Sequence, residues 1–105
     1  MAVQQIKRRP AKRPAIRTVT VQLEGDFEGW EATARVDFPA RYLADFDSGK
    51  LERIIVALDA IVVEHNFPNA EDEIAQSMGD VDPYAALTEF ADKLFDAIEE
   101  FLARS

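Results

Sequence analysis

This 105-residue chain is poor in two residue types that often carry covalent or acid–base chemistry, cysteine and histidine. It contains no cysteine, so disulfides and thiolate chemistry are excluded, and His65 is its single histidine. His65 follows an apolar run, where packing or helix capping is a commoner role for histidine than catalysis. We therefore expect a protein that is not an enzyme.

Long apolar runs are also missing. No stretch of about 18 apolar residues is available to cross a bilayer, and the first residues lack the apolar segment of a secretory signal. The lack of cysteine agrees with a reducing compartment. These features together lead us to expect a cytoplasmic protein with no membrane contact.

The acidic residues do not form a recognisable metal or cofactor motif. Asp45, Asp47 and Gly49 resemble the start of a calcium loop, but the glycine comes one position early, and Val56 stands where the bidentate acid belongs. Acidic runs such as residues 71–73 are more often solvated surface than paired catalytic carboxylates. We expect no metal and no cofactor.

Charge divides the chain into two regions. The net charge is −8, yet residues 1–17 hold six of the 12 Lys and Arg residues and no acid, which gives +6 there and −14 in the remainder. With Pro10, Pro14 and no periodicity, residues 1–17 are predicted to be a disordered basic tail, and residues 18–105 a single domain. The tail residues that could contact nucleic acid or an acidic surface are Lys7, Arg8, Arg9, Lys12 and Arg13. A solubilising or weakly self-associating arm is the favoured alternative, because no aromatic residue lies among them to stack on a base.

The first part of the domain shows the two-residue period of β-strands. Val19, Val21 and Leu23 alternate with polar residues, and a second alternation runs from Trp30 to Phe38 after a turn-rich segment. Residues 18–38 are therefore predicted to form an antiparallel hairpin. Because an isolated hairpin is marginally stable, its apolar face should pack on helices.

Three helices are predicted to follow, at about residues 40–47, 49–65 and 83–103. The middle helix has so wide an apolar face that little of it should face water, and Ser48 is its predicted N-cap. Asp82 is the predicted N-cap of the last helix, with Pro83 at its first position. The expected fold is α+β: an N-terminal antiparallel hairpin on a small bundle of about three helices.

Aromatic residues are the candidates for contacts with another protein. Phe90, Phe95 and Phe101 lie in the apolar stripe of the last helix, where three phenylalanines exceed what a small core needs. Trp30, at the start of the second strand, is the fourth candidate, although a core role is commoner for a tryptophan in this setting. Most of the helical stripe should pack on its own domain.

Residues 19–67 carry a resemblance to a known family. Glu28-Gly29-Trp30, Asp47-Ser48-Gly49 and Asn66-Phe67, in this order and spacing, make the segment similar to the small tail assembly chaperones of long non-contractile-tailed bacteriophages (siphophages) and related prophages. The resemblance implies a non-enzymatic cytoplasmic protein that coats the tape measure protein and delivers tail-tube subunits to it during tail morphogenesis. The basic tail and the last helix lie outside the similar segment.

Two other functions remain open from the sequence. One is a structural virion component, such as a head–tail connector or minor tail protein, for which the basic tail would matter most. A small nucleic-acid-binding regulator would depend on the basic tail alone, because the acidic domain repels nucleic acid.

Overall fold

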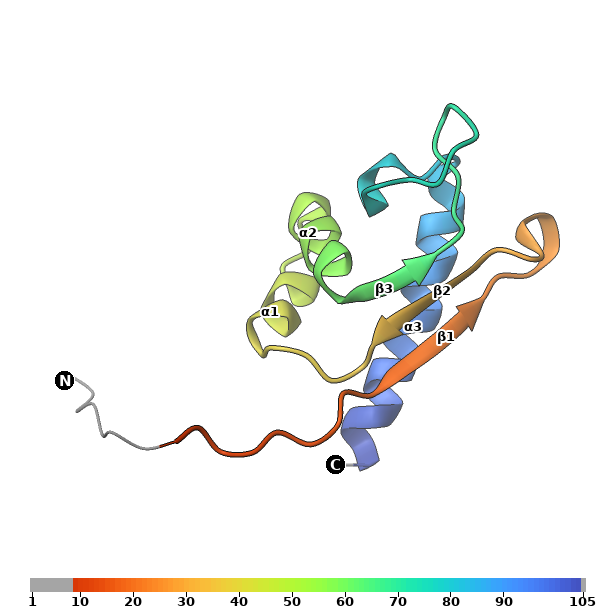
Figure 1. The fold of residues 1–105 in the computed structure, drawn as a ribbon. Coiled ribbons are helices and arrows are strands. Elements are labelled where there is room, and N and C mark those ends of the chain that lie inside the picture. The colour runs from red at the N-terminus through yellow and green to blue at the C-terminus, as the bar shows by residue number, and fades with distance from the viewer. Residues whose placement is uncertain (1–8, 105) are drawn as a thin grey trace.

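The computed structural model describes residues 9–104 as an α+β domain with a three-stranded antiparallel sheet and three α-helices (Figure 1). The fold class expected from the sequence is confirmed. Residues 1–8, with the predicted contacts Lys7 and Arg8, lie outside the described part. In chain order the elements are β1 (Thr18–Gln22), the 3₁₀ turn η1 (Gly25–Phe27), β2 (Glu31–Arg35), α1 (Arg41–Asp47), α2 (Leu51–Ile61), β3 (Val62–His65), the 3₁₀ turn η2 (Met78–Asp80) and α3 (Tyr84–Arg104).

The predicted hairpin is present as β1 and β2. Thr18 pairs with Arg35 and Gln22 with Glu31, so the two strands are in register over their whole length. The hydroxyls of Thr20 and Thr33 are hydrogen bonded across the pair at 2.8 Å on the solvent-facing side. Strand β2 is shorter than the alternating pattern suggested, because it ends at Arg35 rather than near residue 38.

The prediction of one helix over residues 49–65 is wrong at its C-terminal end. Helix α2 stops at Ile61, and the next four residues form β3, which pairs with β2 on the side opposite β1. Two physical causes favour the strand. The run from Ile61 to Val63 is β-branched, and the Asn66 side chain accepts the Glu31 N–H at 2.8 Å, which secures the end of β3 to the start of β2.

The expectation that little of the middle helix faces water is also wrong. Only Ala57, Leu58 and Ile61 of α2 are buried, whereas Leu51 and Val56 are 65% and 61% exposed. The periodic pattern identified apolar positions correctly, but the described chain covers only one side of this helix. Apolar surface is therefore left open on α2.

The two predicted helix starts also differ in detail. Ser48 does not cap α2; its hydroxyl donates to the Asp45 carbonyl at 2.6 Å and accepts the Lys50 N–H at 3.1 Å, so it closes the turn between α1 and α2. Helix α3 begins at Tyr84, and Pro83 precedes it and accepts the Ala86 N–H through its carbonyl. Pro83 therefore acts at the cap and not as the first helical residue.

The Asp59 carboxylate forms two hydrogen bonds that attach the segment between β3 and α3 to helix α2. Asp59 of α2 accepts the Met78 N–H at 2.6 Å and the Ser77 hydroxyl at 2.7 Å, so both of its oxygens are used. Met78 is buried beneath this contact, and Phe67 at the start of the segment is fully buried. A segment with little regular structure is in this way fixed to the core.

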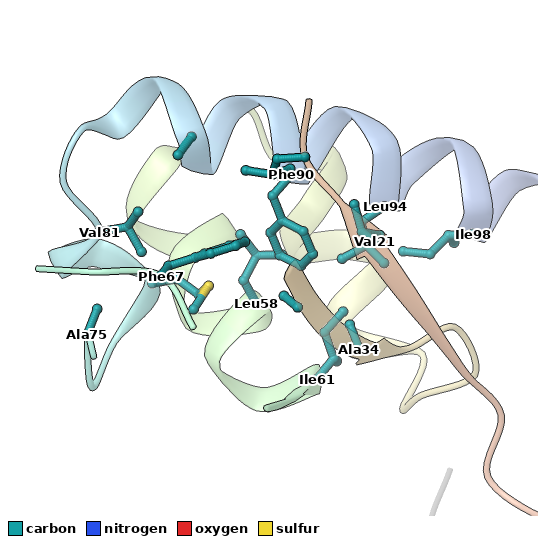
Figure 2. Close-up of a cluster of buried hydrophobic side chains, with 14 of the residues drawn as sticks. Val21, Ala34, Leu58, Ile61, Phe67, Ala75, Val81, Phe90, Leu94 and Ile98 are labelled. Atoms are coloured by element: carbon teal, nitrogen blue, oxygen red, sulfur yellow. The ribbon is translucent and has the colours of Figure 1, made fainter. Parts of the chain in front are cut away.

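The core lies where α2, α3 and one face of the sheet meet. Figure 2 shows Phe90 and Leu94 of α3 close to Leu58 of α2 and Val21 of β1. Full burial of each large side chain contributes about 1.5–3 kcal/mol, so this cluster is the main source of stability. Within residues 9–104, no helix combines the length and the apolar character needed to cross a membrane.

Candidate partner-binding surface

The C-terminal half of α3 borders an apolar groove that opens to solvent on the side of α1. The groove has a volume of about 300 Å³, and we call it the α1–α3 groove. Its lining residues are Leu43, Phe46, Asp47, Phe95, Ile98, Glu99 and Leu102. Leu43 and Leu102 are 39% and 48% exposed, and the carboxylates of Asp47 and Glu99 add negative charge to the rim. The surface therefore combines an apolar floor with an acidic border.

Aromatic packing sets the position of α1 against α3 and so forms this groove. The ring of Phe46 meets the ring of Phe95 edge-on, with centroids 5.1 Å apart. Phe38, in the connection after β2, lies 5.8 Å from Phe46 in the same edge-on arrangement. Phe95 is half-buried in this cluster, so it forms part of the floor of the groove while also supporting the fold.

A second hollow lies on the other side of α3, near the start of β1. It has a volume of about 480 Å³, and Phe101, Val36 and Pro14 contribute apolar walls to it. The Arg17 guanidinium sits 5.9 Å from the centroid of the Phe101 ring, within the range of a cation–π contact. Phe101 is half-buried and shares this hollow with the end of the basic tail.

Phe90 does not lie on this surface, contrary to the sequence-based prediction. It is fully buried, and its ring meets the fully buried ring of Phe67 edge-on at 5.4 Å. The physical reason is its position on α3: Phe90, Leu94 and Ile98 recur every four residues on the side that faces the core. Phe90 is therefore a core residue and is not available to a partner.

Trp30 joins the β1–β2 turn to the core. It is half-buried, with ring centroids 4.8 Å from Phe27 and 6.1 Å from Phe67. The exposed part borders a hollow of about 550 Å³ whose lining includes Glu24, Glu28 and Glu31. This packing gives Trp30 a structural role. The hollow beside Trp30 has an acidic lining, whereas the lining of the α1–α3 groove is mostly apolar.

The described part of the basic tail is exposed. Arg9, Lys12 and Arg13 are solvent-accessible and lie in an extended segment that leads away from the sheet at the start of β1 (Figure 1). Within residues 9–104, none of these three predicted nucleic-acid contacts lines a hollow with Trp30 or Phe95, whereas Pro14 and Arg17 of the tail share the hollow of Phe101.

His65, the single histidine, is used in the packing of the fold. His65 Nδ1 accepts the Phe67 N–H at 3.0 Å, and the two rings are 5.4 Å apart, so His65 packs on the core. A small hollow of about 210 Å³ beside it is bordered by the exposed Glu31 and Glu64. In residues 9–104, no group of three or more histidine or carboxylate side chains is placed to hold a metal ion.

Arg41 on α1 has a shifted pKa, and this residue does not line any of the hollows described above. The hydrogen bond from the Arg41 guanidinium to the Tyr42 hydroxyl, together with the charge interaction between them, raises the pKa of Arg41. Arginine is protonated under all physiological conditions, so this shift has no acid–base consequence.

Of the seven residues that line the α1–α3 groove, the sequence identified only Phe95 as a partner contact; the missed residues include Leu43, Phe46 and Leu102. Leu43 and Phe46 are spaced three residues apart, and that spacing predicted the short helix but not its contact with α3. Leu102 belongs to the same apolar stripe as Phe95 and Phe101, and the stripe alone does not show which side is covered.

The motifs that carry the family resemblance lie at structural junctions. The Asn66 side chain donates to the Gly29 carbonyl at 3.0 Å, and Phe67 packs near Trp30, so the first and last motifs meet. Ser48 closes the turn between α1 and α2, as described above. No protein-family model, curated protein or solved structure matches this chain.

Proposed function

We propose that this chain is a non-enzymatic tail assembly chaperone of a siphophage or prophage. In this role it binds the tape measure protein and tail-tube subunits in the host cytoplasm during tail morphogenesis, without a cofactor. The resemblance of residues 19–67 to that family supports the proposal, and the α1–α3 groove is the observation that carries it.

The groove has the chemistry expected of a site for an amphipathic helix. Its floor is formed by half-buried or buried side chains such as Phe46, Phe95 and Ile98, which can receive apolar side chains spaced along one helical face. Leu43 and Leu102 flank this floor and lose water when a partner docks. Asp47 and Glu99 favour a partner with basic residues beside its apolar stripe.

The charge of the chain suits a protein that keeps apolar surface exposed. A net charge of −8 opposes non-specific association, and acidic residues are effective at maintaining solubility. Exposed apolar residues outside the groove, such as Leu51 and Val56 on α2, belong to the apolar surface that this charge helps to keep in solution. The combination supports binding of another protein over catalysis.

Co-purification with the tape measure protein tests the proposal. We expect the double substitution Leu43→Gln and Leu102→Gln to weaken retention of the co-expressed tape measure protein by at least about tenfold, because two apolar contacts are lost from the groove. Both side chains are partly exposed and glutamine is a good helix former, so the fold should persist.

The matched control is Leu51→Gln with Val56→Gln, which removes two apolar side chains that are even more exposed, on α2 and outside the groove. Retention should stay near that of the unmodified chain. If the control alone loses the tape measure protein, the groove is not the binding site. If the unmodified chain retains neither the tape measure protein nor the tail-tube protein, the proposed function is wrong.

Virion content separates this proposal from a head–tail connector or minor tail protein. An assembly chaperone is expected in lysates of infected or induced cells and absent from purified particles, whereas a structural component remains in the particle. Mass spectrometry of purified virions gives the answer, and detection at the stoichiometry of a tail component would favour the structural role.

A further inference from the structure

Strand β1 has an open edge. Within the described residues its only strand neighbour is β2. At the two ends of this pair, the Leu23 N–H donates to the Trp30 carbonyl at 2.9 Å and the Val36 N–H donates to the Arg17 carbonyl at 3.1 Å. Hydrogen-bonded pairs alternate along an antiparallel ladder, so the odd-numbered residues of β1 face β2 and the even-numbered residues direct their N–H and C=O groups outward.

This edge lacks the features that usually prevent strand pairing. Its sequence, Thr-Val-Thr-Val-Gln, contains no charge and no proline, and its register with β2 is regular. The opposite edge, β3, is different, because it carries the exposed Glu64 and its pairing with β2 has a register shift. One outward group of β1 is already used: the Gln22 carbonyl accepts the Lys93 ammonium at 3.1 Å. The edge around Thr18 and Thr20 is the part open to a new strand.

We propose that two copies of this chain associate by antiparallel pairing of their β1 edges about a two-fold axis at Thr20. In this arrangement Thr20 of each copy exchanges backbone hydrogen bonds with Thr20 of the other, and the Gln22 N–H of each copy donates to the Thr18 carbonyl of the other. The two sheets then join into one continuous sheet. The inference stands on the strand edge and the charge pattern, and it does not depend on the proposed function.

Charge complementarity identifies a second copy as the occupant. Residues 9–17 lead directly into β1, and residues 23–30 follow it, so antiparallel pairing places the basic segment of one copy beside the β1–β2 turn of the other. The basic segment exposes Arg9, Lys12 and Arg13, and the turn exposes Glu24, Asp26 and Glu28. The ladder itself ends near Leu23, because residues 25–27 form η1, and beyond that point the basic segment of one copy lies alongside the acidic turn of the other. The same chain thus carries both halves of a self-complementary contact.

The pairing of two β1 edges requires the basic segment to be free to lie along a second copy, and Figure 1 agrees with this. Residues 9–17 are extended and lead away from the body of the domain, so they are placed to lie along another molecule. Arg17 is held near Phe101 by the cation–π contact, which fixes where the segment leaves the sheet. The basic segment is therefore anchored at the edge that it would extend.

Sedimentation equilibrium of the full chain, combined with a proline substitution, tests the pairing. Thr20→Pro removes an outward N–H while leaving the β1–β2 ladder intact, and proline is tolerated on edge strands. Loss of the reciprocal Thr20 hydrogen bonds should raise the dimer dissociation constant by about 10- to 100-fold. Thr20→Ala is the matched control, because it removes the same hydroxyl and its contact with Thr33 but keeps the N–H, so it should dimerise close to the unmodified chain.

Charge reversal provides a test that does not depend on the proline variant folding. Lys12→Glu with Arg13→Glu, and separately Asp26→Lys with Glu28→Lys, should each weaken dimerisation by about tenfold at low salt. The chain that carries all four substitutions restores opposite charges across the contact and should regain most of the affinity. Added salt should weaken the unmodified dimer and the four-substitution dimer alike.

Three results would overturn the proposal. One is an unmodified chain that sediments as a monomer over the accessible concentration range. This result counts against the proposal even if the β1 edge of that monomer pairs with an extended segment of another protein. Another is a folded Thr20→Pro variant that dimerises as tightly as Thr20→Ala. The third is a dimer whose affinity neither charge reversal changes.

Discussion

Asn66 and Glu31 exchange two hydrogen bonds: the Asn66 side-chain oxygen accepts the Glu31 N–H at 2.8 Å, and the Asn66 N–H donates to the Glu31 carbonyl at 3.2 Å. The side-chain amide nitrogen of Asn66 also donates to the Gly29 carbonyl at 3.0 Å. One residue therefore ties the end of β3 to the start of β2 and to the turn before it. This junction therefore favours the pairing of residues 62–65 with β2.

Substitution of Asn66 is expected to weaken the fold measurably. Asn66→Ala leaves the Glu31 N–H and the Gly29 carbonyl without their side-chain partner and should lower the free energy of unfolding by about 1–3 kcal/mol. Asn66→Asp keeps the acceptor and loses the donor, so it should fall between alanine and the unmodified chain. Urea denaturation followed by circular dichroism measures both. Equal stability of the alanine variant and the unmodified chain would show that the junction is not required.

Phe90 and Leu102 lie on the same helix, but their truncation should cost very different amounts of stability. Phe90 is fully buried against Phe67, so Phe90→Ala should cost about 3–5 kcal/mol of unfolding free energy through lost contacts and a cavity. Leu102→Ala should change stability by less than about 1 kcal/mol because the side chain is half exposed. Thermal denaturation of the two variants checks the ranking, and a reversed order would contradict the placement of Phe90 in the core.

The contact between Phe46 and Phe95 should show energetic coupling. Their edge-on rings at 5.1 Å predict a coupling free energy of about 0.5–1.5 kcal/mol in a double-mutant cycle with leucine at each position. A cycle between Phe46 and Trp30, which belongs to a different aromatic group near the β1–β2 turn, is the control and should give additive effects. Additivity in the Phe46–Phe95 cycle would mean that α1 is not held to α3 through these rings.

Asp59 should be replaceable by asparagine but not by alanine. Asp59→Ala leaves the Met78 N–H without its acceptor beside a buried side chain, and we expect a loss of about 1–3 kcal/mol. Asp59→Asn keeps an oxygen for that N–H and adds a donor that the Ser77 hydroxyl can accept, so most of the stability should remain. Amide hydrogen exchange at Met78 reports the same contact locally. Equal exchange rates in the two variants would rule out the proposed role of the carboxylate.

The elements that sequence predicted best are those fixed by local pattern. Alternation in β1 and β2 defined the hairpin, because side chains on successive residues of a strand point to opposite faces. Strand β3 was missed because its pairing with β2 depends on Asn66 and Glu31, which are 35 residues apart. The run Ile61-Val62-Val63 fits the apolar period of a helix as well as a buried strand, so the local pattern could not decide.

The candidate site was less predictable than the fold, for a related reason. Periodicity along α3 marked Phe90, Phe95 and Phe101 as equally apolar, although only the stripe of Phe90, Leu94 and Ile98 faces the core. The four-residue spacing of that stripe was the signal that could have separated Phe90 from the other two. The sequence of α2 contains no comparable signal for its exposed side, because which face of α2 is buried depends on where the other elements pack.

Trp30 is the single tryptophan, and it lies where the β1–β2 turn, Phe67 and the Asn66 junction meet. Excitation selective for indole therefore reports on this one region and on nothing else in the chain. Quenching or a spectral shift on mixing with another protein would register an event at the turn, whereas a partner seated between α1 and α3 would leave the emission unchanged. Trp30 is therefore an intrinsic fluorescent probe that distinguishes binding at the β1–β2 turn from binding in the α1–α3 groove.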